Sequence, residues 1–247
     1  MITAAIFDIG GVLAHDVWEH MLLDKPDGIA SRYGLDRCGP DGNLVERVGA
    51  LLWEAFAYRP ATQHNDWQAL EIQYWRQFIG FIWGRQPPSD VSVDNFIQMT
   101  DDFINLVDAG MICLLERLQS RGIDLAICSN NNEFWFRRQM DKLSLHRFFS
   151  PSKVILSCRI GVSKSSPRFE MFHAVVDALR VAKSQCVFVD DRKDNVDRAK
   201  QFGIAAVRFI DVQQLMDCLH PRVCHRLFHR IRGARPCEAS IDSLRRC

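Results

Sequence analysis

Five short apolar runs, separated by stretches with helical spacing, most constrain how this 247-residue chain can fold. The runs span residues 4–9, 124–130, 153–157, 185–191 and 205–210. Each is almost continuously hydrophobic, which is typical of strands buried on both faces of a parallel sheet. Apolar residues recur with helical spacing at 111–122, 169–180 and 195–203. The alternation predicts an α/β fold built on a Rossmann-like parallel sheet.

Residues 17–108 interrupt this alternation directly after the first run. They contain no run that predicts a strand, and they hold five of the six tryptophans. The simplest interpretation is an inserted helical cap domain, in which "GRQPPSD" (84–90) marks a break between helices. We therefore expect three parts, which are an α/β core at 1–16 and 109–219, the helical cap at 17–108, and a basic extension at 220–247.

The composition and the charge pattern exclude several classes of protein. No apolar run approaches the roughly 18–20 residues that a membrane span requires, and the N-terminus lacks the pattern of a signal peptide. The nine cysteines form no Cys-x-x-Cys pair, which argues against a disulfide framework and a structural zinc site. We expect a cytoplasmic protein with no membrane partner.

The extension at 220–247 is rich in arginine. It carries seven arginines and two acids, so that its net charge is +5. Apart from Phe228 it has no interleaved aromatic residue, and it has no binding motif, so we interpret it as a solvated segment and expect no nucleic-acid partner. The sequence indicates no oligomeric state.

Polar side chains follow the apolar runs at the points where the predicted strands end. They are Asp8, Ser129, Asn130, Asp190 and Asp191, with Lys164 a few residues after the third run. Taken singly, such residues are commonly helix caps, turn residues or surface lysines. Ligands of open α/β sheets bind at the carboxyl ends of the strands. Together these residues therefore indicate an oxygen-rich site suited to Mg²⁺ and to a phosphoryl group.

The chain resembles the haloacid dehalogenase superfamily over roughly residues 3–215. Four segments carry the resemblance: "FDIGGVL" (7–13), "CSNNN" (128–132), "GVSKSSP" (161–167) and "VFVDDRKDN" (187–195). The predicted insert follows the first segment, where the family's C1-type cap lies. The Asp-x-Gly first motif is similar to that of phosphatase-like members of subfamily I.

The resemblance implies a role for each matching residue. Asp8 would be the nucleophile that takes up the phosphoryl group as an aspartyl-phosphate, with Ser129 and Lys164 as the other catalytic residues. The implied substrate-binding residues are Gly11, Ser129, Asn130 and Lys164. The implied Mg²⁺ ligands are Asp8, the backbone carbonyl of Gly10, Asp190 and Asp191.

Gly10 departs from the phosphatases of the family, which usually carry there a second aspartate that transfers protons. Three interpretations stay open. The first is a Mg²⁺-dependent hydrolase of a small phosphorylated metabolite such as a sugar phosphate. It is favoured because Asp8, Lys164 and the paired acids are all present. His15 and Asp16 are the candidates to replace the missing aspartate. The second is a metal-free 2-haloacid dehalogenase. The third is an impaired protein that binds a phosphorylated ligand or a partner without turnover.

Overall fold

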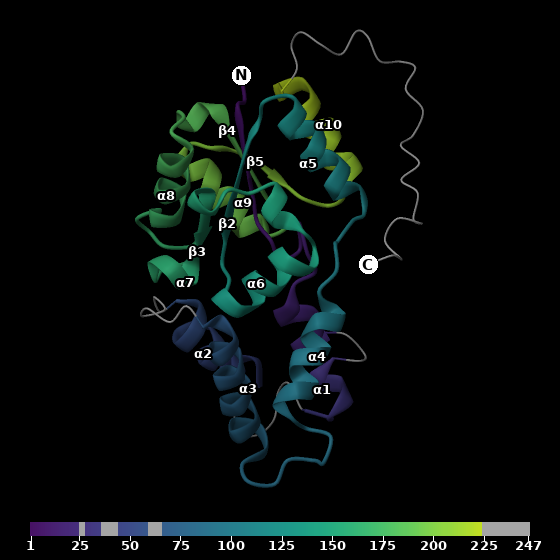
Figure 1. Cartoon of the computed structure of the whole chain (residues 1–247). Helices are drawn as coiled ribbons and strands as arrows, with labels where there is room; N and C mark the ends of the chain where they lie inside the picture. The colour runs from purple at the N-terminus through teal and green to yellow at the C-terminus, as the bar shows by residue number, and fades with distance from the viewer. Residues whose placement is uncertain (25–27, 36–43, 59–65, 224–247) are drawn as a thin grey trace.

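The chain forms a parallel sheet of five strands in the order β3-β2-β1-β4-β5, as seen in the computed structural model (Figure 1). The structure describes residues 1–24, 28–35, 44–58 and 66–223. The strands are β1 (Ala4–Phe7), β2 (Asp124–Ser129), β3 (Val154–Leu156), β4 (Cys186–Asp190) and β5 (Ala205–Arg208). Each lies within one of the five apolar runs, which confirms the predicted α/β fold.

The central strand β1 is buried on both faces. It pairs in parallel with β2 from Ala4 opposite Asp124, and with β4 from Ala4 opposite Cys186. Because successive side chains of a strand point to opposite faces, Ala4 and Ile6 join one hydrophobic cluster while Ala5 and Phe7 join another. This arrangement explains why the first run is apolar throughout rather than alternating.

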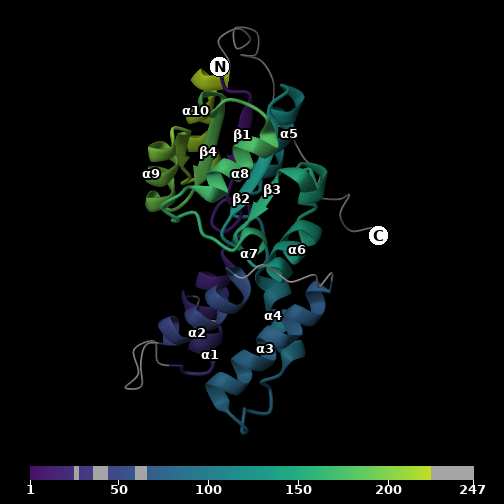
Figure 2. The ribbon, with the colours of Figure 1, turned by 90° about the vertical axis from the view of Figure 1, so that its left-hand side faces the viewer.

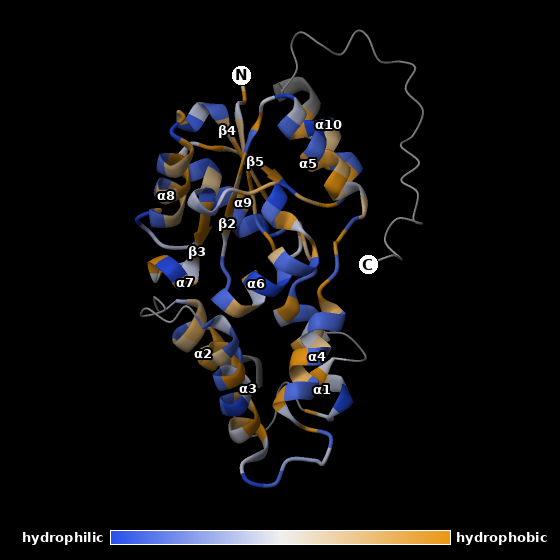
Figure 3. Cartoon of the chain, viewed as in Figure 1, coloured by the Kyte–Doolittle hydropathy of each residue, from blue (hydrophilic) through white to orange (hydrophobic). Residues whose placement is uncertain are grey.

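Helices cover both faces of the sheet. The cluster around Ala5 and Phe7 is completed from α5 (Gly110–Ser120) and α10 (Val212–Val223), and the cluster around Ala4 and Ile6 from α8 (Glu170–Leu179) and α9 (Lys193–Phe202). Figure 3 shows strands that are mostly hydrophobic between helices that carry both hydrophobic and hydrophilic residues. The doubly wound arrangement is the one that the alternation of runs predicts.

Helices also make up the described part of residues 17–108, here called the helical insert. They are η1 (Val17–Asp24), α1 (Ile29–Arg32), α2 (Leu44–Leu52), η2 (Trp53–Ala57), α3 (Trp67–Trp83) and α4 (Val93–Phe103). Segment 84–90 lies between α3 and α4, which confirms the predicted break. The side chains of Asp66 and Ser92 cap α3 and α4, each accepting a backbone N–H three residues on.

The helical insert has its own hydrophobic cluster, and this cluster extends onto the rest of the chain. Trp75, Phe78 and Phe96 are buried at its centre. Phe134 and Trp135, from α6 (Glu133–Lys142), belong to the same cluster. Both views place the insert beyond the carboxyl ends of the strands (Figures 1 and 2). The exact division into core and cap stays a prediction.

The two connections between sheet and insert run side by side. Ala14 forms an antiparallel bridge with Leu106, and the His15 N–H donates to the Asn105 carbonyl over 3.0 Å. The chain therefore leaves and re-enters the sheet at one place, directly after the first motif.

A partly buried ion cluster joins the insert to α6. Arg138 donates to Glu71 of α3 over 2.6 Å and to both carboxylate oxygens of Asp101 of α4 over 2.9 and 3.0 Å. Glu71 is fully buried, and this burial raises its pKa although the charge of Arg138 opposes the shift. The cation thus stabilises a carboxylate that has no access to water.

The predicted boundary at residue 220 falls within α10, which runs on to Val223. The remainder of the Arg-rich extension, 224–247, lies outside the described residues. Among the described helices, none is both long and apolar enough to cross a membrane.

We predict that Arg138→Met destabilises the protein by about 3–5 kcal/mol, because removing one member of a buried ion pair leaves the other charge without compensation. Arg147→Met is the matched control. Arg147 pairs with Glu116, but both side chains are about half exposed, so we expect a loss of less than about 1 kcal/mol. Urea denaturation measures both values, and equal losses would contradict the role assigned to Arg138.

Candidate active site

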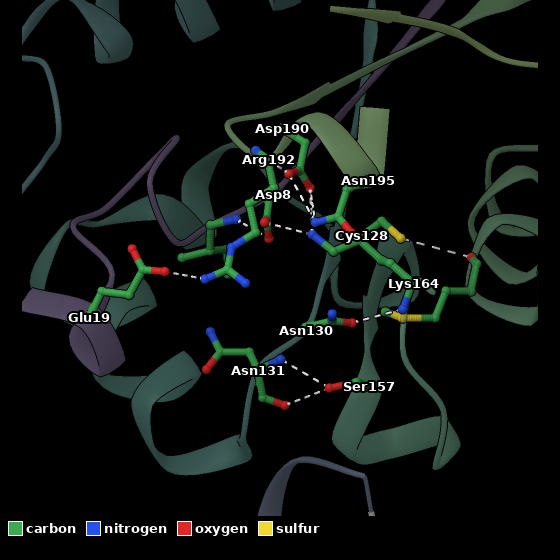
Figure 4. A network of polar contacts seen from close by, with 12 residues as sticks. Asp8, Glu19, Cys128, Asn130, Asn131, Ser157, Lys164, Asp190, Arg192 and Asn195 are labelled. Atoms are coloured by element: carbon green, nitrogen blue, oxygen red, sulfur yellow. Dashed lines mark hydrogen bonds and ion pairs between the residues drawn. The ribbon is translucent and has the colours of Figure 1, made fainter. Parts of the chain in front are cut away.

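The parallel sheet brings the predicted acids together at one edge. Asp8 follows β1 directly, and Asp190 is the last residue of the neighbouring β4. The Asp8 N–H donates to the Val189 carbonyl over 2.9 Å, so the strand pairing continues as far as the first acid. Figure 4 shows both carboxylates pointing toward Lys164.

Lys164 is the cation at the centre of this group. It lies between α7 (Ser157–Ile160) and α8, and its Nζ is 2.6 Å from Asp8 Oδ2 and 2.6 Å from Asp190 Oδ2. Its side chain is only 1% exposed. Such charge-assisted contacts fix the orientation of both carboxylates.

The acids outnumber the cation. Burial is the largest cause that raises the pKa of Asp8; the charge of Lys164 opposes this shift and that of Asp190 adds to it. Burial followed by the charge of Asp190 raises the pKa of Asp191 to about 6. For Lys164, the two carboxylates outweigh the effect of burial and raise the pKa. Three carboxylates around one ammonium leave a net negative charge in a buried place.

This arrangement fits a divalent cation. One oxygen from each of Asp8, Asp190 and Asp191 lies within 4.8 Å of the other two. Carboxylate oxygens are the ligands that Mg²⁺ prefers, and a charge of +2 would offset the excess negative charge. Gly10, the fourth predicted ligand, lies two residues after Asp8 and forms a bridge with Ala14.

Ser129 and Asn130 lie at the end of β2, as predicted. Ser129 is buried, and its hydroxyl lowers the pKa of Asp8 through a hydrogen bond. Asn130 Oδ1 accepts the backbone N–H of Lys164 over 2.9 Å. Asn130 therefore holds the segment that carries the lysine.

The backbone conformation and a neighbouring side chain both require glycine at position 11. Its φ is +72°, a conformation in which residues other than glycine are strained. A Cβ at this position would lie 2.5 Å from Asp191 Oδ2. Any larger residue would displace the carboxylate of Asp191, which is one of the predicted metal ligands.

Sequence reasoning missed several residues at the site. Asn195 of α9 donates to both oxygens of Asp190 over 3.0 and 3.1 Å, and the Arg192 N–H donates to Asp190 Oδ1 over 2.9 Å. The Arg192 side chain forms an ion pair with Glu19 of η1. Both Arg192 and Asn195 lie within the acidic motif at 187–195. Their short distance in sequence from Asp190 was the signal that could have identified them as its partners.

Two groups at or near the insert have shifted pKa values. Burial, followed by the charge of Glu19, raises the pKa of Asp16, which directly precedes the insert. Burial raises the pKa of Tyr58, and the charges of Lys164 and Arg192 oppose this shift. The site is therefore bounded by the sheet edge on one side and the insert on the other.

The fold is that of a known class of enzymes. The family model of haloacid dehalogenase-like hydrolases matches residues 2–203, and the chain belongs to this family of hydrolases. A protein of Arabidopsis thaliana named chloroplastic flavin mononucleotide hydrolase 1 is 31% identical over 106 residues. That match covers 43% of this chain and 41% of the Arabidopsis protein.

Solved structures show the same fold. A haloacid dehalogenase family enzyme of Bacteroides thetaiotaomicron, in complex with magnesium and inorganic phosphate, is similar with a TM-score of 0.61 at 19% identity, over 87% of this chain and 99% of that one. The L-2-haloacid dehalogenase of Xanthobacter autotrophicus, with chloropropionic acid covalently bound, is similar with a TM-score of 0.52 at 19% identity. This match covers 89% of this chain and 82% of that one. At these identities the likeness concerns the fold alone.

We predict that Gly11→Ala reduces Mg²⁺-dependent thermal stabilisation by displacing Asp191. The matched control is Gly122→Ala, because Gly122 has the same φ of +72° but nothing within 4 Å of an added Cβ. Both variants lose about 1–2 kcal/mol to backbone strain, and only Gly11→Ala loses the response to Mg²⁺. Thermal unfolding with and without Mg²⁺ distinguishes them. A full Mg²⁺ response in Gly11→Ala would contradict the prediction.

Proposed function

We propose that this protein is a Mg²⁺-dependent phosphomonoesterase that acts on a small phosphorylated metabolite through an aspartyl-phosphate. The observation that supports this most directly is the cluster of the buried Asp8 and Asp190, which share Lys164, with the partly buried Asp191 beside them and an excess of negative charge. A buried carboxylate is costly unless its charge has a function or a partner. A strand-end aspartate beside a cation is a suitable nucleophile.

Each residue has a role in this proposal. Asp8 attacks phosphorus, and Lys164 orients Asp8 and draws in the phosphoryl group. The Ser129 hydroxyl, with Asn130 and the backbone at Gly11, holds the phosphoryl oxygens. Asn195 and Arg192 fix the carboxylate of Asp190. When bound by Asp8, Gly10, Asp190 and Asp191, Mg²⁺ supplies positive charge next to the transferring phosphoryl group.

In this proposal the helical insert is the C1-type cap, and the chain is a phosphatase-like member of subfamily I, which its Asp-x-Gly first motif supports. Lids of this kind exclude water and select the substrate. Glu19 and Tyr58 are the described insert residues that interact with charged groups of the site. The bound substrate therefore lies between these residues and the sheet edge.

Two other functions of the same fold are weaker. A metal-free dehalogenase does not need Asp191 as a metal ligand. In this chain the carboxylate of Asp191 is partly buried beside Asp190, and the absence of a side chain at Gly11 leaves room for it. A binding protein without turnover needs neither a nucleophile nor a buried lysine that orients it. Because the Arabidopsis relative is named a flavin mononucleotide hydrolase, flavin mononucleotide should be tested as a substrate together with the sugar phosphates.

Phosphate release from a panel of sugar phosphates, nucleotides, acyl phosphates and flavin mononucleotide tests the proposal. We expect turnover with Mg²⁺, and we expect Asp8→Asn to lower kcat by at least about 10³-fold because the amide is a poor nucleophile. Asp177→Asn, on the exposed side of α8, is the control and keeps full activity. Halide release from 2-haloacids without metal indicates the dehalogenase, and silence in both assays indicates a binding protein.

We further predict that Asp190→Asn combined with Asp191→Asn abolishes the rise in Tm that Mg²⁺ causes in the wild type. A ligand present at 100 times its Kd stabilises the folded state by about 2.7 kcal/mol, so the effect is measurable by thermal unfolding. An unchanged rise in Tm in the double variant would show that the metal binds elsewhere.

A further inference from the structure

The space beside Gly10 is filled by another residue of the chain. A Cβ built on Gly10 would lie 3.3 Å from Asp16 Oδ2, 3.5 Å from its Cγ and 3.6 Å from its Cβ. Gly10 is not among the glycines with positive φ, so backbone strain does not explain the absence of a side chain here. The carboxyl group of Asp16 therefore lies in contact with the position that a Cβ of residue 10 would occupy.

A tight turn brings Asp16 back to Gly10. The Ile9 carbonyl accepts the N–H groups of Leu13 and Ala14, each over 2.9 Å, and Ala14 bridges with Gly10. Three residues later, at Val17, the chain enters η1. The carboxylate of Asp16 therefore comes from the residue directly before the insert but lies against the nucleophile's own loop.

The two oxygens of Asp16 have different neighbours. Oδ1 accepts the backbone N–H groups of Trp18 over 2.8 Å and Glu19 over 3.3 Å, and so caps the first turn of η1. Oδ2 is the atom nearest to Gly10. One oxygen thus holds the side chain in place, while the other is presented to the loop that carries Asp8.

We propose that Asp16 is the catalytic proton-transfer residue of this enzyme, an inference that rests on the proposed phosphatase function. Hydrolysis of an alkyl phosphate needs a proton on the leaving oxygen, and later a base for the attacking water. The three heavy atoms nearest to the position 10 Cβ all belong to Asp16. Asp16 therefore lies where the missing aspartate would be, whereas the His15 ring lies edge-on to that of His20 at 5.4 Å.

Both half-reactions balance through Asp16. In the first, an Asp8 oxygen bonds to phosphorus, the bond from phosphorus to the leaving oxygen breaks, and protonated Asp16 gives its proton to that oxygen. In the second, the Asp16 carboxylate takes a proton from water as the water oxygen bonds to phosphorus and the bond between phosphorus and Asp8 breaks. Inorganic phosphate leaves, and both aspartates regain their starting states.

Asp16→Asn tests the proposal with little change in structure, because Asn caps helices as well as Asp and has the same shape. We expect kcat/KM, which reports only the steps up to departure of the leaving group, to fall about 10²–10⁴-fold for the best alkyl phosphate of the panel. For 4-nitrophenyl phosphate, whose leaving oxygen needs no proton, we expect kcat/KM to fall by less than about tenfold, while kcat falls for both substrates because they share the aspartyl-phosphate. The control is Asp66→Asn, which changes the equivalent cap of α3 and leaves both rates unchanged.

A residue exchange extends the test. Asp16→Ser keeps a capping hydroxyl and clears the space beside residue 10. Adding Gly10→Asp then returns a carboxyl group to that space from the other residue. We expect the double variant to hydrolyse the alkyl phosphate at least about tenfold faster than Asp16→Ser alone.

The outcomes separate the two proposals. If Asp16→Asn lowers kcat/KM equally for both substrates, or for neither, while Asp8→Asn abolishes both activities, then Asp16 is only a helix cap and this inference is overturned. If the wild type releases no phosphate from any substrate, the proposed function is wrong, and the inference falls with it. A loss of kcat/KM that is confined to the alkyl phosphate supports both.

Discussion

The contact of Lys164 with Asp8 and Asp190 is the interaction on which the rest of this site depends. Two ion pairs of 2.6 Å share one ammonium group that is almost completely buried. Without the lysine, two carboxylates from neighbouring strands would face each other away from water, which is strongly unfavourable. Asn130 holds the lysine through its backbone and Asn195 holds Asp190 through its side chain, so much of the surrounding hydrogen bonding supports this one contact.

The topology of the sheet makes that contact possible. Strands β1 and β4 are neighbours although their sequences are far apart, and both run toward the insert. The chain enters the insert soon after the first motif and returns beside its exit, where Ala14 forms a bridge with Leu106. The loop after Asp8 therefore belongs to both parts, and residues such as Asp16 reach the site from the insert side without a long connection.

Much of the fold and of the site was predictable from sequence, because parallel strands that are buried on both faces read as apolar runs and end at a common edge. Asp8, Ser129 and Asp190 were found in this way. The contact between Asp16 and Gly10 was not, since it depends on how tightly the turn after Ile9 closes, and no local pattern encodes that. The Arg138 cluster joins residues up to 67 positions apart, and a single sequence carries no signal for such pairs.

The buried pair of Glu71 and Arg138 also restricts how this chain can change over evolutionary time. Substituting either residue alone leaves the other charge without its partner, at a cost that is a large fraction of the stability of an ordinary domain. An apolar pair of similar size would be tolerated at the same place, but every single-step path to it passes through a destabilised intermediate. The join between insert and sheet is therefore expected to change by paired substitutions, and the two positions to be inherited as a unit.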